Sequence, residues 1–213
     1  MYIFRIYSKI IKEKKIINRI VIYVGEFMKY KVETQSGEHY IKKMASEIKA
    51  YYKSSGKSEI IICNIGTSKF LGDSVAPLVG SLLRDKKIDI KIYGNLDNQI
   101  NGACVEGFAR DIKKYRDALI IAIDSAISTK EEVGTIKLRT MPVNAGLGVR
   151  GVGIPIGELS IVAITSENKE ALLSGKVDLK IIYKMAENIS KIIVNLDDKI
   201  KRSRRRCSKK SLV

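Results

Sequence analysis

The sequence has no apolar run near its beginning that could cross a membrane. The longest such run among the first 28 residues covers only residues 20–24, whereas a membrane-spanning helix needs about 20. The same segment lacks the apolar core of about 7–15 residues and the small-residue cleavage site of a signal peptide. We therefore predict no membrane span and a cytoplasmic protein, with a basic amphipathic surface helix as an alternative for this segment.

Histidine and cysteine are also scarce. The three cysteines, Cys63, Cys104 and Cys207, are odd in number and far apart, and His39 is the only histidine. This pattern forms neither a disulfide framework nor a CxxC metal knuckle, and it argues against a Cys/His nucleophile and a histidine-containing metal site. We expect Cys63 and Cys104 to be buried, His39 to lie on the surface, and the protein to use no metal and no cofactor.

Positive charge is abundant but gathers at the two ends of the chain. The formal net charge is +16, of which residues 1–30 carry seven Lys/Arg and two Glu, and residues 199–213 eight Lys/Arg and no acid. Residues 31–198, with 24 basic and 21 acidic residues, are nearly neutral. We predict one domain over 31–198, a basic leader over 1–30 that need not belong to it, and a disordered tail over 199–213. The tail is either a solvated appendage or a weak contact for nucleic acid or acidic lipid, and translation could begin at Met28.

Strand and helix patterns alternate through the middle of the chain. Helical periodicity is found over 41–53, 74–84, 101–115, 168–174 and 178–196, and strand patterns over 59–65, 88–96, 117–128, 133–140 and 157–165. The first and third of these strand patterns are continuous apolar runs, typical of strands buried on both faces. Such alternation predicts an α/β fold, a mostly parallel sheet covered on both faces by helices.

Two aspartates follow the pattern of catalytic groups at a sheet edge. Asp73 follows the first strand, and Asp124 ends the run of apolar residues in the third. If these strands are neighbours, both acids face the crevice beyond the carboxyl ends of the strands. Two nearby carboxylates share a proton, which supplies the base and the acid that attack of water on an amide requires. The structural alternative is a helix N-cap for Asp73 and a turn residue for Asp124.

A glycine-rich segment, "NAGLGVRGVGIPIG", is the other dense signal. Its glycines formally spell GxGxxG, but a strand follows instead of a helix, which argues against dinucleotide binding. We expect a glycine-rich flap or backbone wall beside the carboxylates, or a mobile loop without a ligand. A Ser68–Lys69 dyad is disfavoured because neighbouring side chains diverge. Substrate contacts are predicted for Gly66, Thr67, Ser68, Ser74, Ser125, Asn144, Gly146 and Gly148.

The segments "NIGTSKFLGDSVAPLVG", "LIIAIDSA" and "PVNAGLGVRGVGIPIGELSI" resemble the YyaC-type sporulation proteins and, more distantly, the spore germination protease and the hydrogenase maturation proteases. The likeness covers roughly residues 59–196. It implies a three-layer α/β/α sandwich of the phosphorylase/hydrolase-like kind in a spore-forming bacterium. It also implies that Asp73 and Asp124 match the two catalytic aspartates of the germination protease. The histidine of the nickel-binding maturation proteases has no counterpart here.

The resemblance and the acid pair together lead to one functional hypothesis and one alternative. The hypothesis is a sporulation peptidase of the mother cell or forespore, in which Asp73 and Asp124 activate water against a peptide bond of a spore protein. The alternative is a non-enzymatic factor of the developing spore that binds a peptide or protein in the same crevice. Assembly into a homo-oligomer is compatible with both.

Overall fold

The structure, a computed structural model, describes residues 15–17, 20–22, 25–32, 37–147, 151–173 and 176–210. Its strands are β1 (Lys15–Ile17), β2 (Ile20–Ile22), β3 (Gly25–Lys31), β4 (Glu59–Asn64), β5 (Lys91–Tyr93), β6 (Ala118–Ile127), β7 (Thr135–Thr140), β8 (Val143–Ala145), β9 (Ile154–Ile156) and β10 (Leu159–Ser166). Its helices are α2 (Gly37–Ser55), α3 (Val75–Leu83), α4 (Val105–Ile112), α6 (Lys169–Leu173) and α7 (Leu179–Lys210), with 3-10 turns η1 (Leu71–Asp73) and η2 (Lys130–Glu132).

One sheet of six strands organises the molecule, in the order β3-β7-β10-β6-β4-β5. Strands β5, β4, β6 and β10 pair in parallel, and β7 pairs antiparallel with both β10 and β3. The apolar runs in β4 and β6 lie side by side at the centre, as expected for strands buried on both faces. The predicted neighbourhood of the first and third strands is therefore confirmed.

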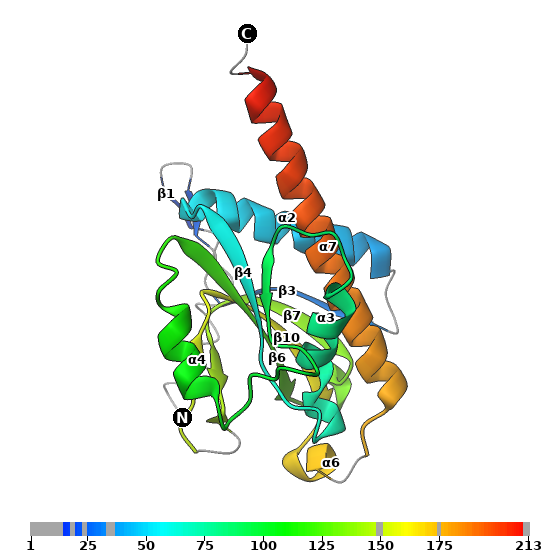
Figure 1. The fold of residues 1–213 in the computed structure, drawn as a ribbon. Coiled ribbons are helices and arrows are strands. Elements are labelled where there is room, and N and C mark those ends of the chain that lie inside the picture. Colours follow the sequence, from blue (N-terminus) through cyan, green and yellow to red (C-terminus); the bar gives the residue numbers. More distant parts are fainter. Residues whose placement is uncertain are drawn as a thin grey trace.

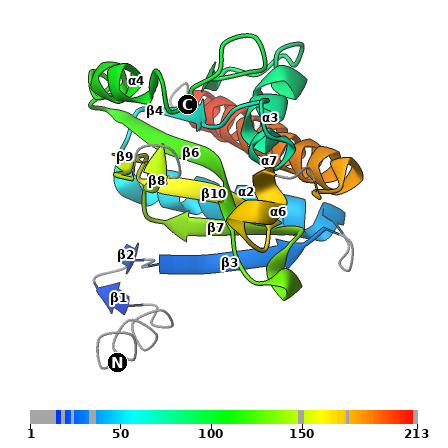
Figure 2. The same cartoon turned by 90° about the horizontal axis from the view of Figure 1, so that it is seen from below.

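Two layers cover this sheet. Helices α2, α3 and α7 lie on one face, and α4 lies on the other together with the β8–β9 ribbon (Figures 1 and 2). Side chains alternate between the faces along each strand, so Ile121 and Ile123 join the core under α2, α3 and α7, while Ala122 joins the core under α4. The α/β class with helices on both sides of a mostly parallel sheet is confirmed.

Both ends of the predicted domain extend further than expected. Residues 25–30, assigned to the leader, belong to the edge strand β3, and Met28 in it is only 8% exposed. The prediction of a disordered tail is wrong for residues 199–210, because they continue helix α7. The apolar stripe of α7 continues to the buried Ile200, and the cations beyond it suit the negative end of the helix dipole.

Two predicted elements are shorter in the structure. The second strand is reduced to Lys91–Tyr93, because the backbone N–H groups of Asp89 and Ile90 donate to the Asp197 side chain instead of to a strand. Helix α4 begins at Val105, which leaves Cys104 exposed, contrary to expectation. Cys63 is buried and His39 is exposed, as predicted. Within the described residues, no helix has the length and apolar character to cross a membrane.

Candidate functional site

Asp73 closes the turn that links β4 to α3. Its side-chain Oδ2 accepts the backbone N–H of Thr67 at 3.0 Å, and its carbonyl accepts the same N–H at 3.2 Å. Gly66 makes this closure possible: its φ is +148°, and a Cβ there would lie 2.3 Å from the Asp73 carbonyl oxygen. The carboxylate is therefore held inside its own loop. It does not cap α3 through a side-chain hydrogen bond, because the N-cap position of α3 is Ser74.

The sequence placed Asp124 at the end of its strand, but in the structure Asp124 lies within strand β6. The strand continues to Ile127 because β10 pairs with it along this length, with Val162 opposite Asp124. The other neighbour, β4, ends at Asn64, which is paired with Ile123. Asp124 is thus the first residue of β6 beyond the end of β4. At this point the loop that follows β4 leaves the sheet and leads to Asp73. The sheet edge that the sequence predicts is formed by this difference in strand length.

Both carboxyl groups have raised pKa values, and the charge of Asp73 acts on Asp124. Burial raises the pKa of Asp73 to about 6, and the Thr67 N–H limits the rise. Burial also raises the pKa of Asp124 well above its ordinary value, and the negative charge of Asp73 raises it further. The backbone N–H of Ser125, 2.8 Å from Asp124 Oδ1, offsets part of that rise. The fold therefore brings the two acids into electrostatic range, with the more strongly raised pKa on Asp124.

Gln99 is a residue of this site that the sequence reasoning missed. Its side-chain Oε1 accepts the Thr67 hydroxyl at 3.0 Å and the Ser68 N–H at 3.1 Å. Its Nε2 donates to Ser68 Oγ at 2.7 Å and to the Leu96 carbonyl at 3.0 Å. Gln99 thereby fixes the loop whose Thr67 N–H binds Asp73. No local motif marks it, because the contact joins residues 31 or 32 positions apart.

Only some of the predicted substrate-contact residues lie beside Asp73 with an exposed side chain. Thr67 and Ser68 lie in the loop beside Asp73, with Ser68 exposed. The Ser74 hydroxyl donates to the Leu71 carbonyl at 2.6 Å and so belongs to the η1 turn. Ser125 meets Asp124 through its backbone, while its hydroxyl is buried without a hydrogen-bond partner among the described residues. Strand alternation turns that hydroxyl to the face opposite Asp124.

The glycine-rich segment is not a simple loop. Strands β8 and β9 pair antiparallel within it, and Val143, Ala145 and Ile156 are buried against the sheet beside α4 (Figure 2). Asn144 alternates with them and is exposed. Gly146 makes the turn after β8 with φ +76°, and Gly148 lies outside the described residues. The expectation of a loop is therefore wrong for β8 and β9. Every second side chain in β8 is buried, as in other strands, but the surrounding glycines hid this alternation in the sequence.

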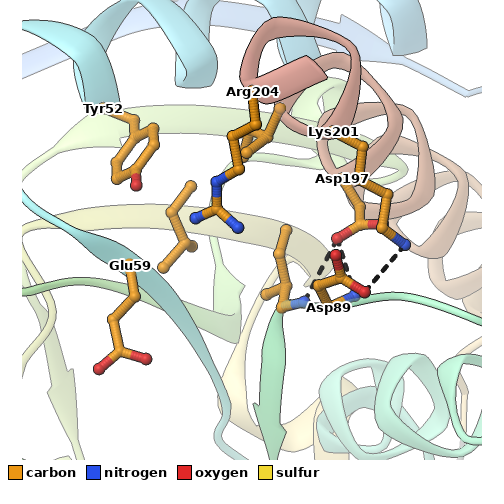
Figure 3. Close-up of a pocket in the computed structure, with 9 residues that line it drawn as sticks. Tyr52, Glu59, Asp89, Asp197, Lys201 and Arg204 are labelled. Atoms are coloured by element: carbon orange, nitrogen blue, oxygen red, sulfur yellow. Dashed lines mark hydrogen bonds and ion pairs between the residues drawn. The ribbon is translucent and has the colours of Figure 1, made fainter. Parts of the chain in front are cut away.

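A second polar cluster surrounds a pocket of about 250 Å³ far along the sheet from the acid pair. It is lined by Glu59 and Ile60, at the beginning of β4, by Tyr52, Asp89 and Ile90, and by Asp197, Ile200, Lys201 and Arg204 of α7 (Figure 3). Asp73 follows the opposite end of β4. This pocket is therefore separate from the acid pair. Among the described residues, no three His, Cys, Asp or Glu side chains gather as metal ligands would.

A mostly parallel open sheet with two interacting acids beyond the end of a central strand defines an α/β protein whose ligand crevice is expected at that edge. Comparison with protein families identifies the group. The chain belongs to the family described as "Protein of unknown function (DUF1256)", which matches residues 28–192.

Known proteins that are similar to the chain include a bacterial relative and a solved structure. The uncharacterized protein YyaC of Bacillus subtilis (strain 168) is 29% identical over 116 residues, which are 54% of this chain and 56% of that protein. The matched part thus spans little more than half of that relative. The predicted resemblance to YyaC-type proteins is confirmed. The crystal structure of a [NiFe] hydrogenase maturation protease, HycI from Thermococcus kodakarensis KOD1, matches with a TM-score of 0.42 and 19% identity, covering 65% of this chain and 94% of that one. A similarity this distant carries no argument about activity.

Proposed function

We propose that this protein is a peptidase in which Asp73 and Asp124 activate water against a peptide bond. The observation that supports the proposal is that the charge of Asp73 raises the pKa of Asp124, although the two carboxyl groups come from separate elements, and that burial raises both pKa values. An isolated turn residue and an isolated strand residue have no reason to lie within electrostatic range of each other. Pairs of acids whose environments separate their pKa values are typical of acid–base catalysis.

The direction of the two pKa shifts assigns the roles. At neutral pH Asp73, with a pKa of about 6, is mostly ionised and is assigned the role of base; Asp124, whose pKa is raised by burial and further by the charge of Asp73, is assigned the role of acid. Asp73 removes a proton from water as the water oxygen attacks the peptide carbonyl carbon. The C–N bond then breaks, and Asp124 protonates the leaving nitrogen. Transfer of one proton from Asp73 to Asp124 restores the starting state.

The substrate class follows from the family resemblance and not from the site. We propose a protein or peptide of the developing spore, cleaved in the cytoplasm of the mother cell or forespore. Thr67 and Ser68, which lie next to Asp73 in the loop held by Gln99, are the residues best placed to contact such a chain. The ribbon residue Asn144 faces away from the sheet and is a weaker candidate than the sequence suggested.

The experiment is a search for new peptide termini. The purified full chain is incubated with a protein extract of sporulating cells, and N-terminal mass spectrometry compares it with the D73N and D124N variants. General acid–base groups contribute about 10²–10⁴-fold to a rate. We therefore expect new termini with the wild type and at least a hundredfold slower formation with either variant. D85N removes an exposed carboxylate outside the site and should cleave like the wild type.

The same experiment separates the peptidase from a binding protein. Capture of a spore peptide without any new terminus, abolished by substitutions in the Thr67–Ser68 loop, would replace the proposal with the non-enzymatic alternative. Cleavage that persists in a D73N/D124N double variant would show that other groups do the chemistry.

A further inference from the structure

The last twelve described residues of α7 form a concentrated positive charge. Residues 199–210 contain eight Lys or Arg and no Asp or Glu, whereas residues 31–198 are nearly neutral. Figure 1 shows this end of α7 projecting away from the sheet and the other helices. The positive charge is therefore carried on an extended helix and not spread over the body of the protein.

The projecting helix has cations but no apolar face. Arg202, Arg204 and Arg205 are exposed, and the last buried apolar residue is Ile200, where α7 leaves the core. Beyond it the sequence "KRSRRRCSKK" contains no large apolar side chain. Helices that lie on membranes bury an apolar face in the lipid, so this composition favours a polyanion that is contacted from water.

Contacts at the base of the projection fix its direction. Asp197, 2% exposed, accepts the N–H groups of Asp89 at 2.9 Å and Ile90 at 3.3 Å through its Oδ1. Lys201 Nζ lies 2.7 Å from Asp197 and 3.1 Å from Asp89, and it donates to the Lys87 carbonyl at 3.0 Å. Figure 3 shows this cluster beside the pocket that Arg204 lines. The helix is held before any partner binds, which reduces the ordering that binding requires.

We propose that the end of α7 binds double-stranded nucleic acid through its phosphates, without reading the sequence. A major groove admits an α-helix, and it is bordered by phosphates on both sides. Successive residues of a helix turn by about 100°, so Arg202 and Arg205, three positions apart and both exposed, lie on the same side of the helix and can contact the phosphates along one border of the groove. Residues 199–210 contain no Asn or Gln to recognise adenine and no aromatic ring to stack on the bases of a single strand.

The experiment uses fluorescence anisotropy to measure binding of the full chain to labelled 24-base-pair duplexes of two unrelated sequences. The measurement is repeated at salt concentrations from 50 to 300 mM. We expect equal micromolar affinity for both sequences and weaker binding to the single strand. The logarithm of the binding constant should fall linearly with the logarithm of salt, by about 0.9 per phosphate neutralised. The R202Q/R205Q/R206Q/K209Q variant should bind at least tenfold more weakly, with a salt slope smaller by about 3–4.

Two controls isolate the helix from net charge. The K43Q/K113Q/K130Q/K180Q variant changes charge equally at exposed sites elsewhere and should bind within threefold of the wild type. R202K/R205K/R206K keeps the charge and should retain binding, and the same midpoint of urea denaturation for the wild type and the four-glutamine variant would exclude loss of folding as the cause. The proposal is overturned by no duplex binding at 50 mM salt, by an equal loss in both four-residue variants, or by tighter binding to vesicles of one part phosphatidylglycerol and three parts phosphatidylcholine.

Discussion

Asp73 bears its charge where water reaches it poorly. Its pKa of about 6, against an ordinary value of 3.8, means that the folded protein binds the proton more tightly than the unfolded chain does. Ionisation therefore destabilises the folded state. The destabilisation is absent below pH 4, grows as the pH rises from about 4 to 6, and is complete above 6. A residue kept only for stability would not be expected in this position.

The first prediction is that D73N stabilises the protein at pH 8. The rise in pKa from 3.8 to about 6 corresponds to about 3 kcal/mol, which is an upper bound because Asp73 is partly exposed to solvent. The amide oxygen of Asn can still accept the Thr67 N–H. Urea denaturation should give D73N a higher free energy of unfolding at pH 8, with the difference vanishing near pH 4.

Asp85 provides the matched control for this measurement. It is exposed, so D85N should leave the free energy of unfolding nearly unchanged at both pH values. A D73N variant less stable than the wild type at pH 8 would mean that the carboxylate of Asp73 is a structural ligand of its loop and not a group held ready for chemistry.

The loop between β4 and η1 is the element that positions this carboxylate. Gly66 allows the backbone to approach Asp73 closely. Gln99, which comes before α4 in the sequence, holds Thr67 and Ser68 through hydrogen bonds to its side chain. Gln99 touches neither carboxyl group by any hydrogen bond shown among the described residues. It is a positioning residue, and its effect on the site passes through the Thr67 N–H.

The second prediction concerns Q99A in the cleavage reaction. Loss of the Gln99 contacts loosens the Thr67 N–H that favours the ionised form of Asp73, so the pKa of Asp73 rises. In the wild type, the rate of cleavage plotted against pH should fall as the pH is lowered, with the midpoint of the fall near pH 6. In Q99A this midpoint should lie at a higher pH. A merely structural loss would lower the rate at every pH without moving the midpoint.

The neighbouring residue gives the control for this element. N98A alters an exposed side chain in the same turn and should leave both the rate and the midpoint unchanged. The Q99A substitution also leaves polar groups of the loop without partners, for which we expect a loss of about 1–3 kcal/mol in the free energy of unfolding.

The molecule as a whole depends on a strand that the charge pattern placed outside the domain. Strand β3 pairs with β7 at one edge of the sheet, and Met28 and Val32 at this edge are 8% and 3% exposed. Each buried side chain of this size contributes about 1.5–3 kcal/mol. The edge strand is therefore a part of the core and not only a cover for β7.

The third prediction compares two shortened chains. A chain that begins at Met28 keeps both buried residues and should lose less than about 2 kcal/mol of unfolding free energy. A chain that begins at Gly37 lacks β3 and should lose about 3–6 kcal/mol. Urea denaturation at neutral pH measures both, and equal stability of the two chains would show that β3 adds nothing to the core.

Apolar periodicity was enough to predict most of the elements, since the continuous apolar runs in β4 and β6 can be satisfied only by burial on both faces. It failed where backbone N–H groups donate hydrogen bonds to a side chain and not to a neighbouring strand. The second strand is short because Asp197 takes the N–H groups of Asp89 and Ile90. No pattern within residues 88–96 could predict an acceptor more than 100 positions away.

The sequence by itself determined the α/β alternation, the position of the central strands and the two acids worth examining, because these depend on residues close together along the chain. Only the tertiary structure decided that Asp124 stands beyond the end of β4, that Gln99 supports Asp73 through its loop, and that the basic residues continue a helix. These facts depend on strand length, register and contacts between distant segments, which local propensity does not encode.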